Sequence, residues 1–341
     1  MDELSGSIID FTEAAYDLDS GDEVWLPKLL EAGQPAMDRG LGVAGVLYGR
    51  PPGGGRVQLL RVDTLGCRDD FAERHAQAIA ATPEEILHEQ AKPGQAGTMS
   101  ENTRGRPEEL ERYTSFVPYC KDLLGITAVD PNGVGAAIIV PLDKVTTLSG
   151  RAKERWQMLG AHVCAAHRLR QGLIVHDRLL TDLPFGAEAV LDPNGFQIVD
   201  AYQQAEVRSA RERLRNAALR VDRARGRLRN EDPAQALELW TALVQGRWSL
   251  VDWFDSDGRR FVLALPNPPE LADPRGLTER ETQVVTYVVY GFTNKMISYQ
   301  LGISSSRVSA LLRSAMRKLN VHTRASLIKL FRDMQQVALP A

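Results

Sequence analysis

The sequence predicts an α+β region followed by an all-α domain of four short helices, and two observations support this division. Up to Leu265, short apolar runs recur on either side of turn sequences such as Asp192-Pro193-Asn194-Gly195, a pattern typical of β-hairpins. After Leu277, apolar residues recur instead at helical spacing, between residues that cap helices. A chain of 341 residues fits two or three domains.

The charge distribution changes at the same place. Residues 277–334 hold nine Lys and Arg against three acidic residues, a net charge of +6. Because the whole chain carries −3, the remaining residues carry −9. A cationic module on an acidic body indicates that this end of the chain meets a polyanion.

Local signals predict the four helices of this module. The first three have predicted N-caps at Thr278, Thr293 and Ser304, and the fourth begins near Thr323. Gly291 ends the first helix, and Gly302 permits a sharp turn between the second and the third. The third helix has one apolar stripe, formed by Val308, Leu312, Ala315 and Leu319, and an outer face that is polar and basic. Two helices about a tight glycine turn describe a helix-turn-helix.

This stretch resembles the DNA-binding domain of LuxR-type (NarL/FixJ-like) transcriptional regulators, without gaps over residues 277–334. The matching residues are Leu277, Thr278, Arg280, Glu281, Val284, Gly291, Thr293, Asn294, Lys295, Ile297, Leu301, Ile303, Ser304, Val308, Leu312, Lys318, Leu319, Val321 and Arg324. The resemblance implies that the third helix enters the major groove of double-stranded DNA and that the fourth helix often mediates dimerisation. It places base contacts on Ser309, Ala310 and Arg313 and a phosphate contact on Lys295.

The predicted DNA-binding surface is wider than those four residues. It comprises Thr293, Asn294, Lys295, Ser305, Ser306, Arg307, Ser309, Ala310, Arg313 and Arg317. Three positions on or near this surface depart from the family pattern: Arg307 stands where Thr is common, Ser309 where Lys or Arg is common, and Leu311 where His is common. The alternative is a helical packing domain that no longer binds DNA. The charges of Arg307, Arg317 and Lys318 favour DNA binding.

Two features predict a homodimer. The fourth helix presents a predicted apolar patch, formed by Leu327, Leu330, Phe331 and Met334. An Arg-rich stretch further upstream has a heptad formed by Val207, Leu214, Val221 and Leu228. This heptad fits either a helix-pairing seam between two subunits or an amphipathic helix that lies on its own domain, and the second interpretation is favoured. In a third interpretation, its Arg face rests against DNA or against the acidic region.

Residues 1–175 are predicted to form one α+β domain. β-like runs at 43–48 and 57–62, and at 124–129 and 134–140, form two hairpins, and a long helix over 150–172 follows them. Residues 92–108, rich in Gly, Lys, Pro, Ser and Asn, are expected to form a mobile loop. The order of elements resembles a GAF sensory domain. That resemblance implies a pocket, between the sheet and its covering helices, for an unknown small molecule.

Residues 183–266 repeat a simpler pattern, in which two hairpins bracket the Arg-rich helix, and they are loosely similar to a PAS-like domain. Residues 274–337 then form the helix-turn-helix domain, behind a linker rich in proline. A response regulator or a quorum-sensing receptor fits less well. No acidic pair follows the first strand, and the 276 residues before Leu277 suffice for two domains.

No enzymatic motif, cofactor site or metal site is predicted. The sequence has no P-loop, GxSxG or dinucleotide fingerprint. His162, Cys164 and His167 are close in sequence, but their spacing favours ordinary helix residues over a metal site. Three cysteines without CxxC spacing, an acidic N-terminus and the lack of an apolar run long enough for a membrane span together predict a cytoplasmic location.

We therefore expect a regulator that couples a sensory region to promoter binding. Two alternatives stay open at this point. In one, the N-terminal region is an interaction or dimerisation module without a small-molecule ligand. In the other, the protein is a redox sensor that acts through Cys67 or Cys120.

Overall fold

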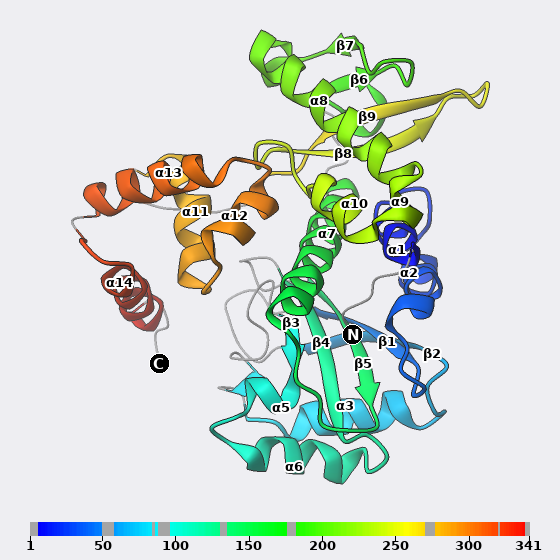
Figure 1. Ribbon diagram of the computed structural model, residues 1–341, viewed down its shortest axis with the longest axis vertical. Helices are drawn as coiled ribbons and strands as arrows, with labels where there is room; N and C mark the ends of the chain where they lie inside the picture. The colour runs from blue at the N-terminus through cyan, green and yellow to red at the C-terminus, as the bar shows by residue number, and fades with distance from the viewer. Residues whose placement is uncertain are drawn as a thin grey trace.

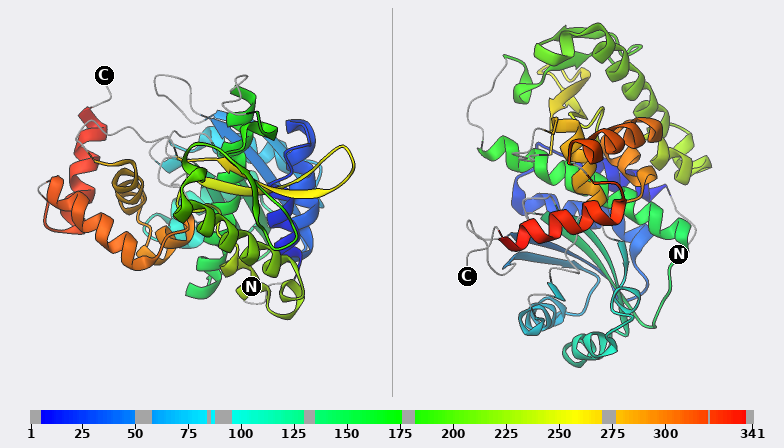
Figure 2. Two further views of the ribbon diagram at one scale, coloured as in Figure 1. Left: turned by 90° about the horizontal axis from the view of Figure 1, so that it is seen from above. Right: turned by 90° about the vertical axis from the view of Figure 1, so that its left-hand side faces the viewer.

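The computed structural model describes residues 6–49, 58–83, 86–87, 96–129, 135–175, 182–269, 277–319 and 321–337. It confirms an α+β region with two antiparallel sheets and a helical C-terminal region (Figure 1). Seen from above, the C-terminal helices form a lobe on one side of the molecule (Figure 2, left). Among the described helices, none combines the length with the hydropathy that a membrane-spanning helix needs.

The first sheet has five strands in the order β2-β1-β5-β4-β3. Their bounds are β1 Val43–Gly49, β2 Gln58–Leu65, β3 Ala96–Thr98, β4 Asp122–Val129 and β5 Gly135–Leu142. Both predicted hairpins are present, and β1 and β5 join them. The turn sequences at 50–57 and 130–134 lie outside the described residues.

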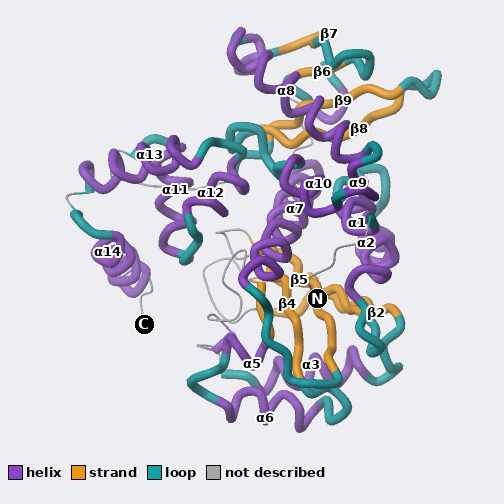
Figure 3. The backbone as a smooth tube through the Cα atoms, in the orientation of Figure 1, coloured by secondary structure: helices purple, strands orange, loops and turns teal. Residues whose placement is uncertain are grey.

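Helices cover both faces of this sheet (Figure 3). One face carries α1 Ser7–Ala15, α2 Asp22–Met37 and α7 Gly150–Val175; the other carries α3 Phe71–Ala81, α5 Met99–Asn102 and α6 Pro107–Phe116. Along β5, Ala136, Ile138 and Val140 therefore belong to one apolar cluster, whereas Ala137 and Ile139 belong to the other. This double cover explains why β5 is apolar throughout.

The prediction of a mobile loop at residues 92–108 is wrong for the part of this segment that the structure describes. Residues 96–98 form the edge strand β3, and α5 follows directly. Thr98 accepts a hydrogen bond from the backbone N–H of Glu101, and the Glu101 side chain closes the capping box. The polar and glycine-rich composition concealed this short signal. Residues 92–95 lie outside the described residues.

The second sheet has four strands in the order β7-β6-β9-β8. They are β6 Ala189–Leu191, β7 Ile198–Ala201, β8 Trp248–Phe254 and β9 Arg260–Pro266, and two 3-10 turns at Pro184–Gly186 and Gln203–Glu206 flank the first hairpin. Between the hairpins lie α8 Arg208–Arg225, α9 Leu228–Glu231 and α10 Pro233–Leu239. As in the first sheet, the first strand of one hairpin pairs with the last strand of the other.

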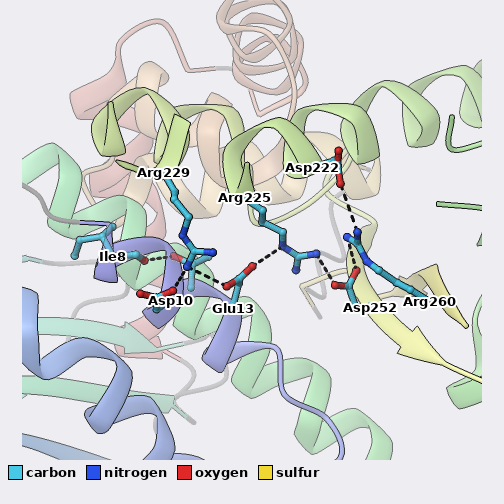
Figure 4. A network of polar contacts seen from close by, with 9 residues as sticks. Ile8, Asp10, Glu13, Asp222, Arg225, Arg229, Asp252 and Arg260 are labelled. Atoms are coloured by element: carbon cyan, nitrogen blue, oxygen red, sulfur yellow. Dashed lines mark hydrogen bonds and ion pairs between the residues drawn. The ribbon is translucent and has the colours of Figure 1, made fainter. Parts of the chain in front are cut away.

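Helix α8 is amphipathic and packs within its own chain. Leu214 and Val221 are buried against the core, and the helix contacts α10. The helix-pairing seam therefore has no free apolar surface at these two positions, as the amphipathic interpretation expects. Arg225, the last residue of α8, bridges Glu13 of α1 and Asp252 of β8, and Arg229 of α9 pairs with Asp10 and Glu13 (Figure 4). These ion pairs tie the second sheet to the N-terminal helices.

The C-terminal region consists of α11 Glu279–Val289, α12 Asn294–Leu301, α13 Ser305–Lys318 and α14 Arg324–Val337. The predicted N-caps are confirmed: Thr278, Thr293 and Ser304 each accept a hydrogen bond from a backbone N–H of the first turn. Gly302 ends α12 in the left-handed conformation, with φ of 60°.

Candidate nucleic-acid interface

Helix α13 has a polar outer face and an apolar inner face. Arg313 and Arg317 are exposed, and among the described residues neither has an ion pair. The first turn exposes Ser305, Ser306 and Arg307, whereas Ser309 and Ala310 are half-buried. The inner face packs into the core through Val308, Leu311, Leu312 and Ala315. Leu311, where the resemblance leads one to expect His, is thus a packing residue.

Two predicted contact residues serve the domain's own structure. Thr293 caps α12 by accepting a hydrogen bond from the backbone of Met296. Asn294 donates from Nδ2 to Ser309 Oγ over 3.1 Å and accepts a hydrogen bond of 3.1 Å from Arg324. Asn294 therefore braces the start of α12 against α13 and α14.

Lys318 is occupied within the domain as well. Its ammonium lies 2.6 Å from Glu281 Oε2, which fastens α13 to α11. Burial raises the pKa of Glu281, but hydrogen bonds from Lys318 and from Thr278 outweigh this effect and lower the pKa to about 2. The carboxylate stays ionised at neutral pH, so Lys318 holds a structural ion pair rather than a free charge for DNA.

Lys295 contacts the N-terminal region. Its Nζ lies 2.6 Å from Oε2 of Glu154, near the start of α7. Both side chains are partly exposed, at 58% and 39%, so this is a surface ion pair of modest strength. The side chain predicted to meet a DNA phosphate is thus paired with an acid of the body.

The helix-turn-helix packs tightly on the loop between α10 and β8. A side-chain carbon added at Gly302 would lie 1.9 Å from the carbonyl oxygen of Leu243. Gln283 of α11 donates from Nε2 to the carbonyl of Gly246 over 3.2 Å. The turn between α12 and α13 therefore serves both the motif and its attachment to the body.

A buried polar cluster joins three parts of the chain behind this contact. The Tyr299 hydroxyl of α12 lies 2.7 and 2.8 Å from the carbonyl oxygens of Leu237 and Trp240, and we assign its single proton to the Leu237 carbonyl. His162 of α7 lies 2.9 Å from the Tyr299 hydroxyl through Nε2 and 3.1 Å from the Tyr16 hydroxyl through Nδ1. We assign the proton to Nε2, which also lies 2.7 Å from the Trp240 carbonyl, so that Nδ1 accepts from Tyr16. Burial lowers the pKa of His162 to about 3 and keeps the ring neutral.

The predicted dimerisation patch needs correction at one position. Leu327 is fully buried within its own domain, because α14 turns this side chain toward the core. Leu330 and Phe331 are half-buried, and the side chain of Met334 lies outside the described residues. The exposed apolar surface of α14 is therefore smaller than the sequence predicts.

A cavity of about 150 Å³ lies between the first sheet and the helices α3 and α6. It is mainly apolar, and its lining includes Val46, Leu59, His75, Met99, Tyr113 and Ile139. Small residues on the strands, Gly97, Gly125 and Ala137, leave this space open. One polar pair marks its wall: His75 Nδ1 lies 2.9 Å from the Tyr113 hydroxyl. Burial lowers the pKa of His75 to about 4, so the pair is neutral.

The two candidate redox cysteines are poor thiolates. Cys67 is half-buried and donates to the carbonyl of Val43, and Cys120 is buried and donates to the carbonyl of Asp122. Burial raises the pKa of each thiol to about 11. Because reaction with oxidants requires the thiolate, neither environment favours redox sensing.

The residues that attach the helix-turn-helix to the body could not be identified from local sequence patterns. Glu154 and His162 lie more than a hundred residues before their partners in α12, and Tyr16 lies equally far before His162. The resemblance named Lys295 but not the acid that pairs with it. Only Gly302 carried a local signal, and that signal indicated a turn rather than a contact.

Comparison with known proteins identifies the C-terminal domain. Residues 275–331 match the family "Bacterial regulatory proteins, luxR family". The chain is 34% identical over 104 residues to the nitrate/nitrite response regulator protein homolog of Haemophilus influenzae, covering 30% of this chain and 47% of that protein. It is 31% identical over 84 residues to the HTH-type transcriptional regulator MalT of Vibrio campbellii, covering 25% of this chain and 9% of that protein. The chain thus spans less than half the length of either relative, and the similarity identifies its C-terminal part as a LuxR-family helix-turn-helix domain.

Proposed function

We propose that this protein is a DNA-binding transcriptional regulator, in which α13 reads the major groove. The observation that carries the proposal is the exposed, basic outer face of α13 within a domain that matches the luxR family. Arg313 would contact base edges, with Ser309 and Ala310 beside it, and Arg317 would contact the DNA backbone. Such a protein would work in the cytoplasm. Its role would be regulatory rather than enzymatic, in line with the name of the relative MalT, a transcriptional regulator.

Two variants test this proposal against promoter fragments selected from genomic DNA. Arg313→Ala should relax sequence preference and weaken specific binding by about 1–3 kcal/mol. Lys295→Ala should weaken specific and random DNA alike and flatten the dependence of affinity on salt. Arg104→Ala, an exposed arginine between α5 and α6, serves as the control. Parental binding by both variants at several salt concentrations would contradict the proposed recognition face.

We further propose that residues 1–175 form a GAF-like sensory domain. The order of its strands, its helices on both faces and the cavity beside α3 support this assignment. The occupant would be a small, mainly apolar molecule with one polar group near His75 and Tyr113. The cavity also favours this function over a pure interaction module. Residues 183–266, with hairpins on both sides of α8, would form a PAS-like connector to the domain at 274–337.

A cavity-filling variant tests the sensory role. Gly125 lines the cavity, and a side chain added there meets open space. Gly125→Leu should therefore abolish the response of a reporter gene to the natural signal, while binding of DNA in vitro persists. Gly105→Leu, on an open loop outside the cavity, is the control. A variant that still responds would indicate that the cavity takes no signal.

The contact between Glu154 and Lys295 suggests how the signal reaches the DNA. We propose that the resting chain holds Lys295 on α7, and that a ligand favours an arrangement in which Lys295 is released. Binding to DNA would involve two copies of the chain, because one helix-turn-helix reads only a short half-site. Leu330 and Phe331 would contribute to that dimer, and sedimentation of the chain with operator DNA would measure it.

A further inference from the structure

A second basic surface lies beside the start of α13. A cleft of about 670 Å³ separates α8 from the helix-turn-helix. Its polar lining comes from α8, from the loop between α10 and β8, and from the C-terminal domain, and it includes Arg213, Asn216, Arg220, Arg280, Ser304 and Arg307. The cleft is thus lined by three separate segments of the chain.

The cleft is strongly cationic. Four arginines line it, and no acidic side chain is among its lining residues. Arg213, Arg220 and Arg307 are exposed, and among the described residues none of the three has an ion pair. Among the described contacts, Arg220 donates to one backbone oxygen, the carbonyl of Glu238, at 3.4 Å. Guanidinium groups without carboxylate partners are suited to phosphate oxygens, which they bind through two parallel hydrogen bonds.

Arg280 adds a second observation. Its side chain is half-buried and donates to Gln283 Oε1 over 2.8 Å, and it has no ion pair among the described contacts. Burial lowers the pKa of this guanidinium, and the nearby Arg247 lowers it further, although Glu279 partly offsets both effects. A partly desolvated cation beside other cations is stabilised when an anion enters the cleft.

The position of the cleft suggests the source of that anion. Ser304 caps α13 and Arg307 lies in its first turn, where the helix dipole attracts negative charge. A helix seated in the major groove has the sugar–phosphate backbone beside it. Viewed from the side of α13, α8 passes above this helix (Figure 2, right). A duplex that receives α13 would thus carry one strand past the arginine face of α8.

We infer that the cleft binds backbone phosphates of the same DNA that α13 reads, so that α8 extends the DNA-binding surface beyond the LuxR-type domain. The inference rests on the proposed function. It gives the Arg-rich helix a role that does not require pairing with a second subunit. Because phosphate contacts carry no base information, α8 adds affinity and fixes the orientation of the body on the duplex without changing the preferred sequence.

The test uses the full chain and a double variant, Arg213→Ala with Arg220→Ala. Two lost phosphate contacts should reduce the slope of log K against log salt by about 1.8. Specific and random duplexes should weaken by the same factor, because only backbone contacts are lost. The matched control is Arg211→Ala with Arg223→Ala: these arginines are exposed on the same helix but do not line the cleft. The control should keep the parental slope.

The outcomes separate this inference from the proposed function. If Arg313→Ala weakens binding while the Arg213/Arg220 variant keeps the parental slope, α8 does not contact DNA and only the inference fails. An equal loss of slope in the control would overturn it too, since the effect would then reflect net charge rather than the cleft. If the parent binds no DNA, both proposals fail. Inorganic pyrophosphate is the last probe. If it stabilises the parent against heat but not the Arg213/Arg220 variant, and the DNA slope is unchanged, the cleft holds a small phosphorylated molecule and the inference is wrong.

Discussion

The two faces of the C-terminal domain use opposite chemistry. Part of the face toward the body is buried and neutral, and there Tyr299 and Gln283 donate hydrogen bonds to backbone carbonyls. The outer face of α13 exposes Arg313 and Arg317, which have no ion pair among the described residues. Neutral hydrogen bonds at fixed distances select one partner in one orientation. Exposed cations attract any phosphate and leave selection to a few base contacts.

This difference separates permanent from exchangeable contacts. Removing one partner of a buried hydrogen bond costs about 1–3 kcal/mol, because the remaining polar group stays buried with neither a protein partner nor water to bind. An exposed ion pair contributes about 0–1 kcal/mol and weakens with salt. The Tyr299 cluster is of the first kind, and the Lys295–Glu154 pair is of the second. The exposed ion pair can therefore break while the buried hydrogen bonds stay intact.

The largest effect is expected at the turn of the motif. Gly302→Ala would place a methyl group 1.9 Å from the Leu243 carbonyl and impose φ of 60° on a residue with a side chain. We expect a loss of more than about 3 kcal/mol in the free energy of unfolding, measured with urea. Gly291→Ala is the control, because it has φ of 89° but nothing within 4 Å. If both variants lose the same free energy of unfolding, backbone strain alone explains the loss. The segment at Leu243 would then move aside at little cost.

Loss of a single hydroxyl should have the next largest effect. Tyr299→Phe leaves the Leu237 carbonyl without its hydrogen bond and removes one neighbour of His162. We expect a loss of about 1–3 kcal/mol in the free energy of unfolding. Tyr202→Phe is the control, a half-buried tyrosine whose hydroxyl has no hydrogen bond among the described contacts. If the two variants are equally stable, the buried cluster does not hold the domains together.

Acid should weaken the same cluster. The pKa of His162 is about 3 when folded, below its value of 6.5 in a model peptide, so the unfolded chain binds more protons at intermediate pH. The stabilisation is complete above pH 6.5 and is lost as the pH falls from 6.5 toward 3. Between pH 6.5 and 5 we expect this residue to contribute a loss of about 1–2 kcal/mol. His162→Gln should show a flatter pH profile of unfolding than the parent, and parallel profiles would exclude His162 as the cause.

The smallest effect is expected at the surface pair. Glu154→Gln should free Lys295 and strengthen binding of random DNA by less than about 1 kcal/mol at low salt. The gain should vanish in the double variant with Lys295→Ala. Lys153→Gln and Arg155→Gln change the charge beside Glu154 in the opposite sense and control for net charge. If the gain in affinity persists in the double variant, Glu154 does not act through Lys295.

Local structure that neighbouring residues determine was largely predictable, although the capping box of Thr98 and Glu101 was missed. Thr278, Thr293 and Ser304 cap their helices as expected, because a cap depends on the three residues that follow it. The hairpins followed from their turn sequences and apolar runs. Periodicity also predicted helix α8, but it could not choose between a second subunit and the chain's own core as the partner of Leu214 and Val221.

What the sequence could not predict depends on contacts between distant segments. Leu327 and Leu330 have the same chemistry and nearly the same position on α14, yet Leu327 is buried and Leu330 is not, because only the packing of α14 distinguishes them. Nothing near Lys295 indicates Glu154, which lies 141 residues earlier. The basic cleft likewise exists only because folding places α8 beside α13.

A rotation of helix α7 about His162 would act like that of a lever, with His162 as the pivot. His162 is held by hydrogen bonds on both ring nitrogens, and Glu154 lies eight residues away on the same helix. At 1.5 Å per residue the arm is about 12 Å long, so a rotation of about 10° moves Glu154 by about 2 Å. A displacement of that size separates an ion pair of 2.6 Å, while atoms at the pivot barely move. A small change in the sheet beneath α7 could thus be amplified at Lys295 without detaching the DNA-binding domain from the body.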